Sequence, residues 1–195
     1  MMVNIEDIQK LRKQTQAPVM ECKKALEEAN GDFKKANQIL KKKGELRAEK
    51  KEASDTKSGV VEAYIHSNHR VGALVELRCE TDFVAKNTEF KKLAYDLAMH
   101  ITALDPKYIA FEKVPKEIIE AKEKEYAEEL KGANKPPEII DKIVKGKLEK
   151  EFQELCLDKQ IFIKDETKNI SQLIKEAIAK FGEKIEISQF IRFQI

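Results

Sequence analysis

A change in the spacing of apolar residues near position 60 constrains the fold of this chain more than any other feature. Along residues 71–79 every odd-numbered position is apolar, which is the period-two pattern of a strand with one buried face. Residues 60–66 alternate in the same way, and the polar residues 67–70 between them suit a hairpin connection. The sequence therefore predicts two paired antiparallel strands.

Helical patterns follow these strands and favour an α+β fold. Apolar residues at three- and four-residue spacing predict a helix that packs on the sheet: Phe90, Leu93, Ala94, Leu97, Ala98 and Ile101. A second helix is predicted over 173–181, a short strand over 160–164, and a last strand over 184–195. In that last strand the apolar odd-numbered residues share one phase, which Gln189 interrupts. Residues 59–195 are expected to form an antiparallel sheet with helices packed on one side.

The first 44 residues have the pattern of three short helices. Pro18 suits the first turn of the second helix, Gly31 ends it, and Asp32 caps the third helix, which Gly44 is expected to end. A bundle of this size is near the lower limit of what a hydrophobic core alone can hold. Residues 1–44 are therefore predicted to be a small docking module.

A charged segment follows the module, and residues 45–58 are predicted to be a linker. Between positions 41 and 51 there are six basic residues against two acidic ones, Glu45 and Glu49. No aromatic residue is interleaved to stack on bases, so solvated positive charge is a better interpretation than a nucleic-acid surface. Direct nucleic-acid binding is not expected.

Two long charged helices are predicted over 112–132 and 136–156. Pro115 and the pair Pro136-Pro137 mark their starts, and Gly132 ends the first. Their apolar stripes are thin and their neighbours are mostly Lys and Glu, which is typical of a solvated surface with i,i+4 pairs. We expect an antiparallel helical hairpin over about 112–156 that projects from the body of residues 59–195.

The segment between the second strand and the helix that follows it holds Phe83 between Asp82 and Val84, without glycine or proline. Segments between rigid elements often carry function, because the scaffold can aim exposed side chains at a partner. From the residues alone, Phe83 is either core filler or an exposed probe. Cys79, just before this segment, is predicted to be a small buried residue rather than a nucleophile.

The remaining chemistry of the chain is sparse. Three cysteines lie far apart, and no Cys/His cluster suggests a metal site, so a reducing cytosol is expected and neither cofactor nor metal is predicted. No apolar run approaches the ~18 residues of a membrane helix, and the start does not resemble a signal peptide. Phosphate-binding glycine loops and hydrolase motifs are absent.

Two classes of function remain. The first is an interaction protein whose small module and α+β body grip one partner at two places. The second is a cytosolic enzyme of unfamiliar motif that uses Asp82 and Glu80 in a cleft beside the sheet. The three histidines, His66, His69 and His100, are expected to be polar turn residues or a structural residue, because no convergent partners are visible. The residues favour an interaction protein, not an enzyme.

Two long ordered motifs stand out in the chain. The first comprises Leu11-Arg12, Thr15, Met20-Glu21-Cys22-Lys23-Lys24-Ala25-Leu26 and Gly31-Asp32. The second is Cys79-Glu80-Thr81-Asp82-Phe83-Val84-Ala85-Lys86-Asn87. Both resemble the bacterial-type translation elongation factor Ts family. The resemblance continues through His66, Lys145-Gly146 and Phe190-Ile191-Arg192-Phe193, and so spans almost the whole chain.

The resemblance implies an exchange factor that binds elongation factor Tu with GDP, displaces Mg²⁺ and promotes GDP release so that GTP can bind. The helical module looks like the family's ubiquitin-associated (UBA)-like domain, in which Arg12, Val19 and Met20 match positions that face the partner. The run Thr81-Asp82-Phe83-Val84 matches the segment credited with displacing Mg²⁺. His66 is a further candidate contact to elongation factor Tu.

The chain also departs from the family. Relatives commonly read Thr-Gly-Ala-Gly-Met-Met where this chain has Thr15-Gln16-Ala17-Pro18-Val19-Met20, and the loss of two glycines stiffens that turn. Long members carry two related halves in the core, whereas this chain has one. Short members work as homodimers, so the resemblance implies a homodimer built on the α+β body.

Overall fold

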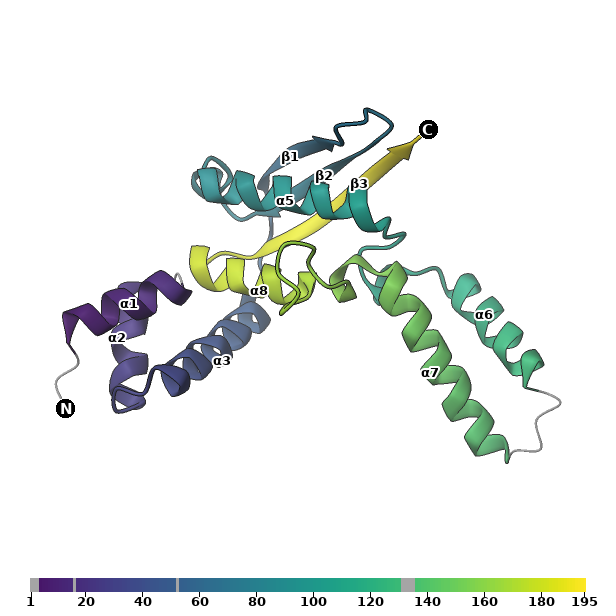
Figure 1. Cartoon of the computed structure of the whole chain (residues 1–195), viewed down its shortest axis with the longest axis horizontal. Coiled ribbons are helices and arrows are strands. Elements are labelled where there is room, and N and C mark those ends of the chain that lie inside the picture. The colour runs from purple at the N-terminus through teal and green to yellow at the C-terminus, as the bar shows by residue number, and fades with distance from the viewer. Residues whose placement is uncertain (1–3, 16, 52, 131–135) are drawn as a thin grey trace. The chain divides into compact units, whose positions relative to one another are not determined.

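A computed structural model describes residues 4–15, 17–51, 53–130 and 136–195 (Figure 1). The chain divides into two compact units, each built from several segments. The first comprises Met1–Glu62, Val75–Asp96 and Gln172–Phe190, and the second comprises Ala63–Leu74, Leu97–Ser171 and Ile191–Ile195. Each boundary between the units except that at residues 171 and 172 falls inside a strand or inside the helix 88–104. The fold is α+β, as predicted.

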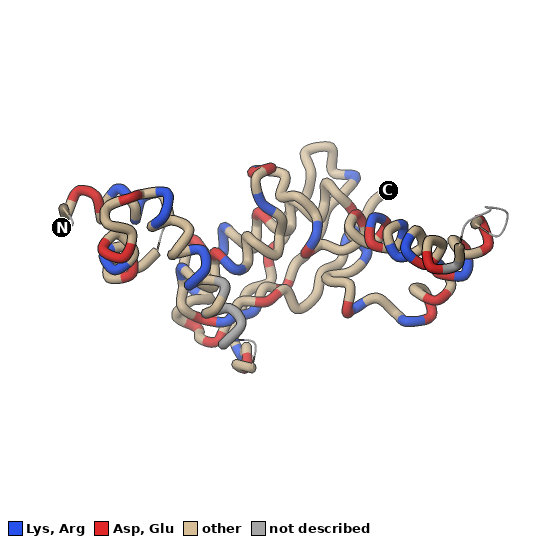
Figure 2. Tube along the Cα trace, turned by 90° about the horizontal axis from the view of Figure 1, so that it is seen from below, with Lys and Arg blue, Asp and Glu red and all other residues tan. Residues whose placement is uncertain are grey.

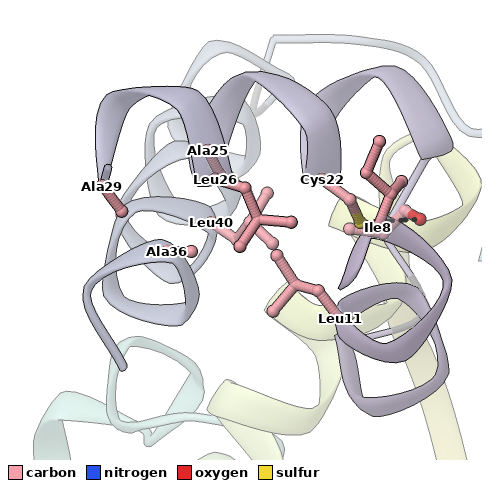
Figure 3. Packing of buried hydrophobic residues seen from close by; sticks show 9 residues of the cluster. Ile8, Leu11, Cys22, Ala25, Leu26, Ala29, Ala36 and Leu40 are labelled. Carbon is pink, nitrogen blue, oxygen red and sulfur yellow. Dashed lines mark hydrogen bonds between the residues drawn. The ribbon is translucent and has the colours of Figure 1, made fainter. Parts of the chain in front are cut away.

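Three helices form the amino-terminal part of the first unit: α1 (Ile5–Thr15), α2 (Val19–Glu28) and α3 (Phe33–Lys51). Asp32 caps α3, because its Oδ1 accepts the backbone N–H of Lys34 and of Lys35 at 2.9 and 3.1 Å. The buried residues of the three helices form one cluster (Figure 3): Ile8, Leu11, Ala17, Cys22, Ala25, Leu26, Ala29, Ala36 and Leu40. The predicted three-helix module therefore has its own core.

The prediction that Gly44 ends the third helix is wrong. Helix α3 continues through it to Lys51, so the first part of the predicted 45–58 linker is helical. A Cβ atom at Gly44 would lie 3.0 Å from the Cβ of Ala179 in α8 (Ile170–Phe181). The glycine is there because two helices approach closely, which is a long-range cause that the local pattern does not reveal.

A three-stranded antiparallel sheet contains β1 (Ser58–Ile65), β2 (Val71–Cys79) and β3 (Ile185–Gln194), in the order β1-β2-β3. The predicted hairpin is confirmed, and the backbone N–H of His66 donates to the carbonyl of Val71 at 2.9 Å. Gly59 lies opposite the end of β2, where a Cβ atom would be 2.4 Å from the carbonyl oxygen of Leu77. Only glycine fits there without movement of the backbone.

One face of β2 is buried, as the alternation predicts. In the first unit, Val75, Leu77 and Cys79 are buried on this face, and the ring of Phe90 in α5 (Thr88–Leu104) meets that of Phe181 in α8 edge to face, with centroids 6.0 Å apart. In the second unit α5 contacts β3, because Arg192 Nε donates to the carbonyl of Thr102 at 3.0 Å. The predicted stripe of α5 is confirmed.

Strand β3 does not keep the single phase that was predicted for it. Ile185 is 2% exposed, whereas Ile191 is 48% exposed and therefore lies on the other face. Arg192, the next residue, turns to α5, since its Nε donates to the carbonyl of Thr102 at 3.0 Å. The odd-numbered residues are thus buried at the start of β3 and exposed near its end.

The second unit contains the predicted helical hairpin, formed by α6 (Lys116–Glu129) and α7 (Pro137–Leu155). Lys and Arg alternate with Asp and Glu along both helices (Figure 2). Buried apolar residues hold the hairpin together: Val114, Val144, Leu148, Phe152 and Cys156. Tyr126 fastens it further, because its hydroxyl donates to Glu151 at 2.6 Å and Lys147 lies 4.9 Å above its ring. None of the helices in the described ranges is long and apolar enough to cross a membrane.

Residues 160–164 were predicted to be a strand, which is wrong. After the short 3₁₀ turn Leu157–Lys159 the chain forms a loop whose ends meet at one isolated bridge, Ile161 with Asn169. Another 3₁₀ turn, Phe111–Lys113, precedes α6. The loop packs on His100, which is fully buried. Its Nε2 lies 3.0 Å from Gln160 Oε1, and its Nδ1 accepts the N–H of Ile163 at 3.4 Å. Burial lowers the pKa of His100, so this histidine is neutral and structural, as expected.

Candidate functional site

The segment that holds Phe83 is a short helical turn, α4 (Asp82–Ala85), placed between the end of β2 and the start of α5 (Figure 1). Thr81 caps it, because its Oγ1 accepts the N–H of Val84 at 3.4 Å. Cys79 Sγ donates to the carbonyl of Thr81 at 3.2 Å. The turn is therefore fixed to the last residue of the central strand.

Phe83 is the most conspicuous side chain of this turn. It is 84% exposed, whereas Val84 and Ala85 beside it are 5% and 6% exposed. A phenylalanine that faces water while its neighbours are buried leaves a large apolar surface uncovered. Of the two alternatives that the sequence left open, the structure places Phe83 outside the core, with Cys79 and Phe90 as buried residues on either side.

A second segment holds the turn from the far end of the chain. Both oxygens of Glu183 accept hydrogen bonds: Oε2 from the N–H of Glu80 at 3.1 Å and of Thr81 at 3.0 Å, and Oε1 from the Thr81 hydroxyl at 2.6 Å. Glu80 in turn accepts the N–H of Lys184 at 2.7 Å and the Nζ of Lys51 at 2.9 Å. We call these two interlocked carboxylates the Glu80–Glu183 clamp.

The contacts of Glu80 and Asp82 show whether these two carboxylates could act together as an acid–base pair. The hydrogen bond from the backbone of Lys184, with that from Lys51, lowers the pKa of Glu80, so its carboxylate is ionised and engaged. Asp82 accepts the hydroxyl of Ser58 at 2.9 Å and lies 3.8 Å from Lys86 Nζ. Each carboxylate has its own partners, and no hydrogen bond joins the two. This arrangement does not favour an acid–base pair.

Neither the thiols nor a metal cluster offers an alternative chemistry in the described part of the chain. Burial raises the pKa of Cys79 and of Cys156 to about 11, and it also raises the pKa of Cys22. Such thiols stay protonated near neutral pH and are poor nucleophiles. No group of three or more His, Cys, Asp or Glu side chains among the described residues is placed to hold a metal ion.

The predicted docking residues lie on the surface of the three-helix module. Arg12 is exposed on α1, and Val19 and Met20 are 45% and 61% exposed in the first turn of α2. Gln16 lies outside the described residues. Pro18 precedes α2 with extended backbone angles, so it sets the direction in which the chain enters the helix. These three side chains are thus accessible together with Phe83 in the first unit.

His66 belongs to the second unit, at the end of β1. It is exposed, and its Nδ1 lies 3.2 Å from the hydroxyl of Tyr64. The same unit carries an apolar sheet surface that faces away from the helices. We call it the open sheet face and define it by five exposed residues: Ile65, Leu74, Ile191, Phe193 and Ile195. Exposed apolar residues gathered in this way mark interaction surfaces.

Comparison with known proteins identifies the family. The sequence model of the family described as elongation factor TS matches residues 4–195. The chain belongs to the elongation factor Ts family. It is 50% identical over 195 residues to elongation factor Ts of Thermotoga maritima, covering 100% of this chain and 97% of that protein. It is 47% identical over 194 residues to elongation factor Ts of Thermosipho melanesiensis, covering 100% and 99%.

Membership in the elongation factor Ts family gives the chain a role as a nucleotide exchange factor in translation elongation, and it implies elongation factor Tu as the partner. Of the residues that the family resemblance singled out, Val84 is buried, and the others are exposed: Arg12, Val19, Met20, His66, Thr81, Asp82 and Phe83. Sequence reasoning missed Glu183, because it lies about a hundred positions from Thr81 and carries no motif. Only the folded chain brings that carboxylate to the turn.

Proposed function

We propose that this chain binds elongation factor Tu with GDP bound, displaces its Mg²⁺, and promotes GDP release so that GTP can bind. The observation that carries the proposal is the 84% exposure of Phe83 on a turn that is fixed on its inner side. In this mechanism Asp82 and Phe83 reach the partner. Thr81 and Val84 hold the turn, as cap and as buried anchor.

An exchange factor accelerates release only if it binds the nucleotide-free partner more tightly than the nucleotide-bound one. Nucleotides in such GTPases are held by Mg²⁺ and by backbone N–H groups around the phosphates. A wedge beside that site weakens both contacts, and burial of Phe83 in the partner supplies the free energy. Full burial of one phenylalanine is worth about 1.5–3 kcal/mol, or roughly tenfold to a hundredfold in an equilibrium constant.

The free energy from burial of Phe83 is therefore too small by itself, and the chain needs a second contact with the partner. Arg12, Val19 and Met20 supply it in our proposal, because all three are exposed on the helical module and residues of these types are common at interfaces. His66 is proposed as a further contact from the second unit. We assign docking to residues 1–44 and the exchange surface and dimerisation to residues 59–195, joined by 45–58. We place this work in the cytoplasm, where elongation takes place.

The test measures release of a fluorescent GDP analogue from elongation factor Tu. Wild-type protein should accelerate release, and Phe83→Ala should lose roughly tenfold to a hundredfold of that acceleration. Tyr95→Ala is a matched control, because Tyr95 is a 42% exposed aromatic residue on α5 that is not in the turn. If wild type does not accelerate release, the exchange mechanism is wrong. If both variants act like wild type, only the wedge role of Phe83 is wrong.

We also propose that the chain works as a homodimer whose subunits meet at the open sheet face. Five exposed apolar residues support this proposal, four on three adjacent strands and Ile195 directly after β3, since a sheet with one uncovered apolar face is stable when a second sheet covers it. A second copy presents the same surface, and twofold symmetry makes such a surface self-complementary. A monomeric mass in light scattering at micromolar concentration, with full exchange activity, would refute the homodimer.

A further inference from the structure

We propose that Glu183 is a positioning residue for Phe83, an inference that rests on the proposed exchange function. Glu183 follows the end of α8 and precedes β3. Gly182 lies between it and Phe181, with a φ of +75° that lets the chain turn out of the helix. Phe181 contacts the buried ring of Phe90, and Ile185 is 2% exposed. The carboxylate of Glu183 thus lies between Phe181, whose ring meets the buried ring of Phe90, and the buried Ile185.

All three hydrogen bonds of Glu183 go to the residues that begin the turn. The carboxylate takes the N–H groups of Glu80 and Thr81 on one oxygen and the Thr81 hydroxyl on the other, at 2.6–3.1 Å. Hydrogen bonds to an ionised acceptor are about twice as strong as neutral ones. They also orient the Thr81 hydroxyl, whose oxygen accepts the N–H of Val84 and so caps α4. Glu183 therefore acts on Phe83 through Thr81.

The turn needs this support because of its length. Helix α4 has 4 residues, and a single helical turn is unfavourable by itself because few hydrogen bonds offset the loss of backbone freedom. Val84 and Ala85 are buried and anchor its inner side. The outer side carries Phe83, which is 84% exposed, so burial within its own chain does little to stabilise its position. A side chain held in place before binding loses less entropy on binding than a mobile one, so the clamp raises the effect of the wedge.

The clamp is reciprocal, which makes the assignment to Glu183 specific. Glu80 accepts the N–H of Lys184, so each of the two segments supplies a carboxylate to the backbone of the other. Glu80, however, does not bond Thr81, and its second partner is Lys51. Of the two carboxylates, Glu183 is the one that accepts hydrogen bonds from Thr81, the residue that caps the wedge turn.

A double-mutant cycle on release of the fluorescent GDP analogue tests the assignment. Four proteins are compared: wild type, Phe83→Ala, Glu183→Ala and the double variant. Glu183→Ala should slow stimulated release about tenfold, and by no more than Phe83→Ala does. In the Phe83→Ala background the same change should have no further effect, because the residue to be positioned is gone. Glu183→Gln should restore part of the rate, since its amide oxygen still accepts both backbone N–H groups.

The matched control is Glu89→Ala, which removes a 2.6 Å ion pair with Lys180 between α5 and α8 in the same unit and does not touch the turn. Melting temperatures of all variants report loss of fold separately from loss of exchange. A general structural role predicts equal slowing in both backgrounds and similar slowing by Glu89→Ala, and either result overturns the proposal. If Phe83→Ala slows release while the Glu183 effect is additive, the positioning role fails and the exchange function stands. If wild type does not stimulate release at all, the exchange function fails first.

Discussion

Phe193 provides the sharpest test of the proposed homodimer. Its side chain is 64% exposed on the open sheet face, so replacement by alanine removes little from the core of its own subunit. Full burial of a phenylalanine is worth about 1.5–3 kcal/mol, and covering two thirds of one is worth about 1–2 kcal/mol. In a twofold dimer each interface residue counts twice. Phe193→Ala should therefore weaken dimerisation by about 2–4 kcal/mol, or roughly thirtyfold to eight-hundredfold in the dissociation constant.

The assay is sedimentation or light scattering over a dilution series, with the dissociation constant fitted for each variant. Ile139→Ala is the control, because Ile139 is 45% exposed on α7 and does not belong to the open sheet face. A mixed dimer of wild-type and Phe193→Ala subunits should lose half of the free energy that the variant homodimer loses. An unchanged dissociation constant for Phe193→Ala would refute the interface. A full loss in the mixed dimer would refute the twofold arrangement.

Further predictions concern stability. Gly44→Ala should destabilise the chain by about 1–3 kcal/mol in denaturant unfolding, because its Cβ would lie 3.0 Å from that of Ala179, and Ala179→Gly should restore the loss. Gly146→Ala should instead stabilise by about 0.5–1 kcal/mol, since nothing lies within 4 Å of the new Cβ in α7; a destabilised variant would contradict this. The pKa of Glu80 is lowered in the fold, so its contribution is present above pH 4.5 and is lost as pH falls through the lowered value. Unfolding free energy measured against pH should fall less steeply in acid for Glu80→Gln than for wild type, and identical slopes would contradict the assignment.

The local spacing of apolar residues was enough to predict the strands and helices that have one buried face. The odd-numbered stripe of β2 and the stripe from Phe90 to Ile101 on α5 were predicted because burial on one face imposes period two or 3.6 on the sequence itself. The helical hairpin was predicted from Pro115 and the pair Pro136-Pro137, because proline favours the start of a helix through its own backbone geometry. The predicted end at Gly132 lies outside the described residues. The exposure of Phe83 has no such local cause, and periodicity left it open.

These incorrect predictions concern residues whose deciding contacts are far away in the sequence. Gly44 resembles a helix end, but it is a contact point for Ala179, which is 135 positions away. The later odd-numbered residues of β3 resemble a continuation of its buried stripe, but Ile191 and Phe193 are exposed, while Arg192 bonds Thr102, which is 90 positions away. A glycine or an apolar alternation has several uses, and only tertiary contacts select among them.

The same limit explains why the site was predicted only in part. The run from Thr81 to Val84 was found because its order matches a family, and the fold then divides it into two roles: Phe83 is exposed, while Val84 is buried. Burial of one phenylalanine gives roughly a hundredfold at most, so a wedge that moves a tightly held ion must lose little entropy when it binds. The three hydrogen bonds from Glu183 meet that requirement. A short turn becomes an effective wedge because a distant carboxylate holds it in place before the partner arrives.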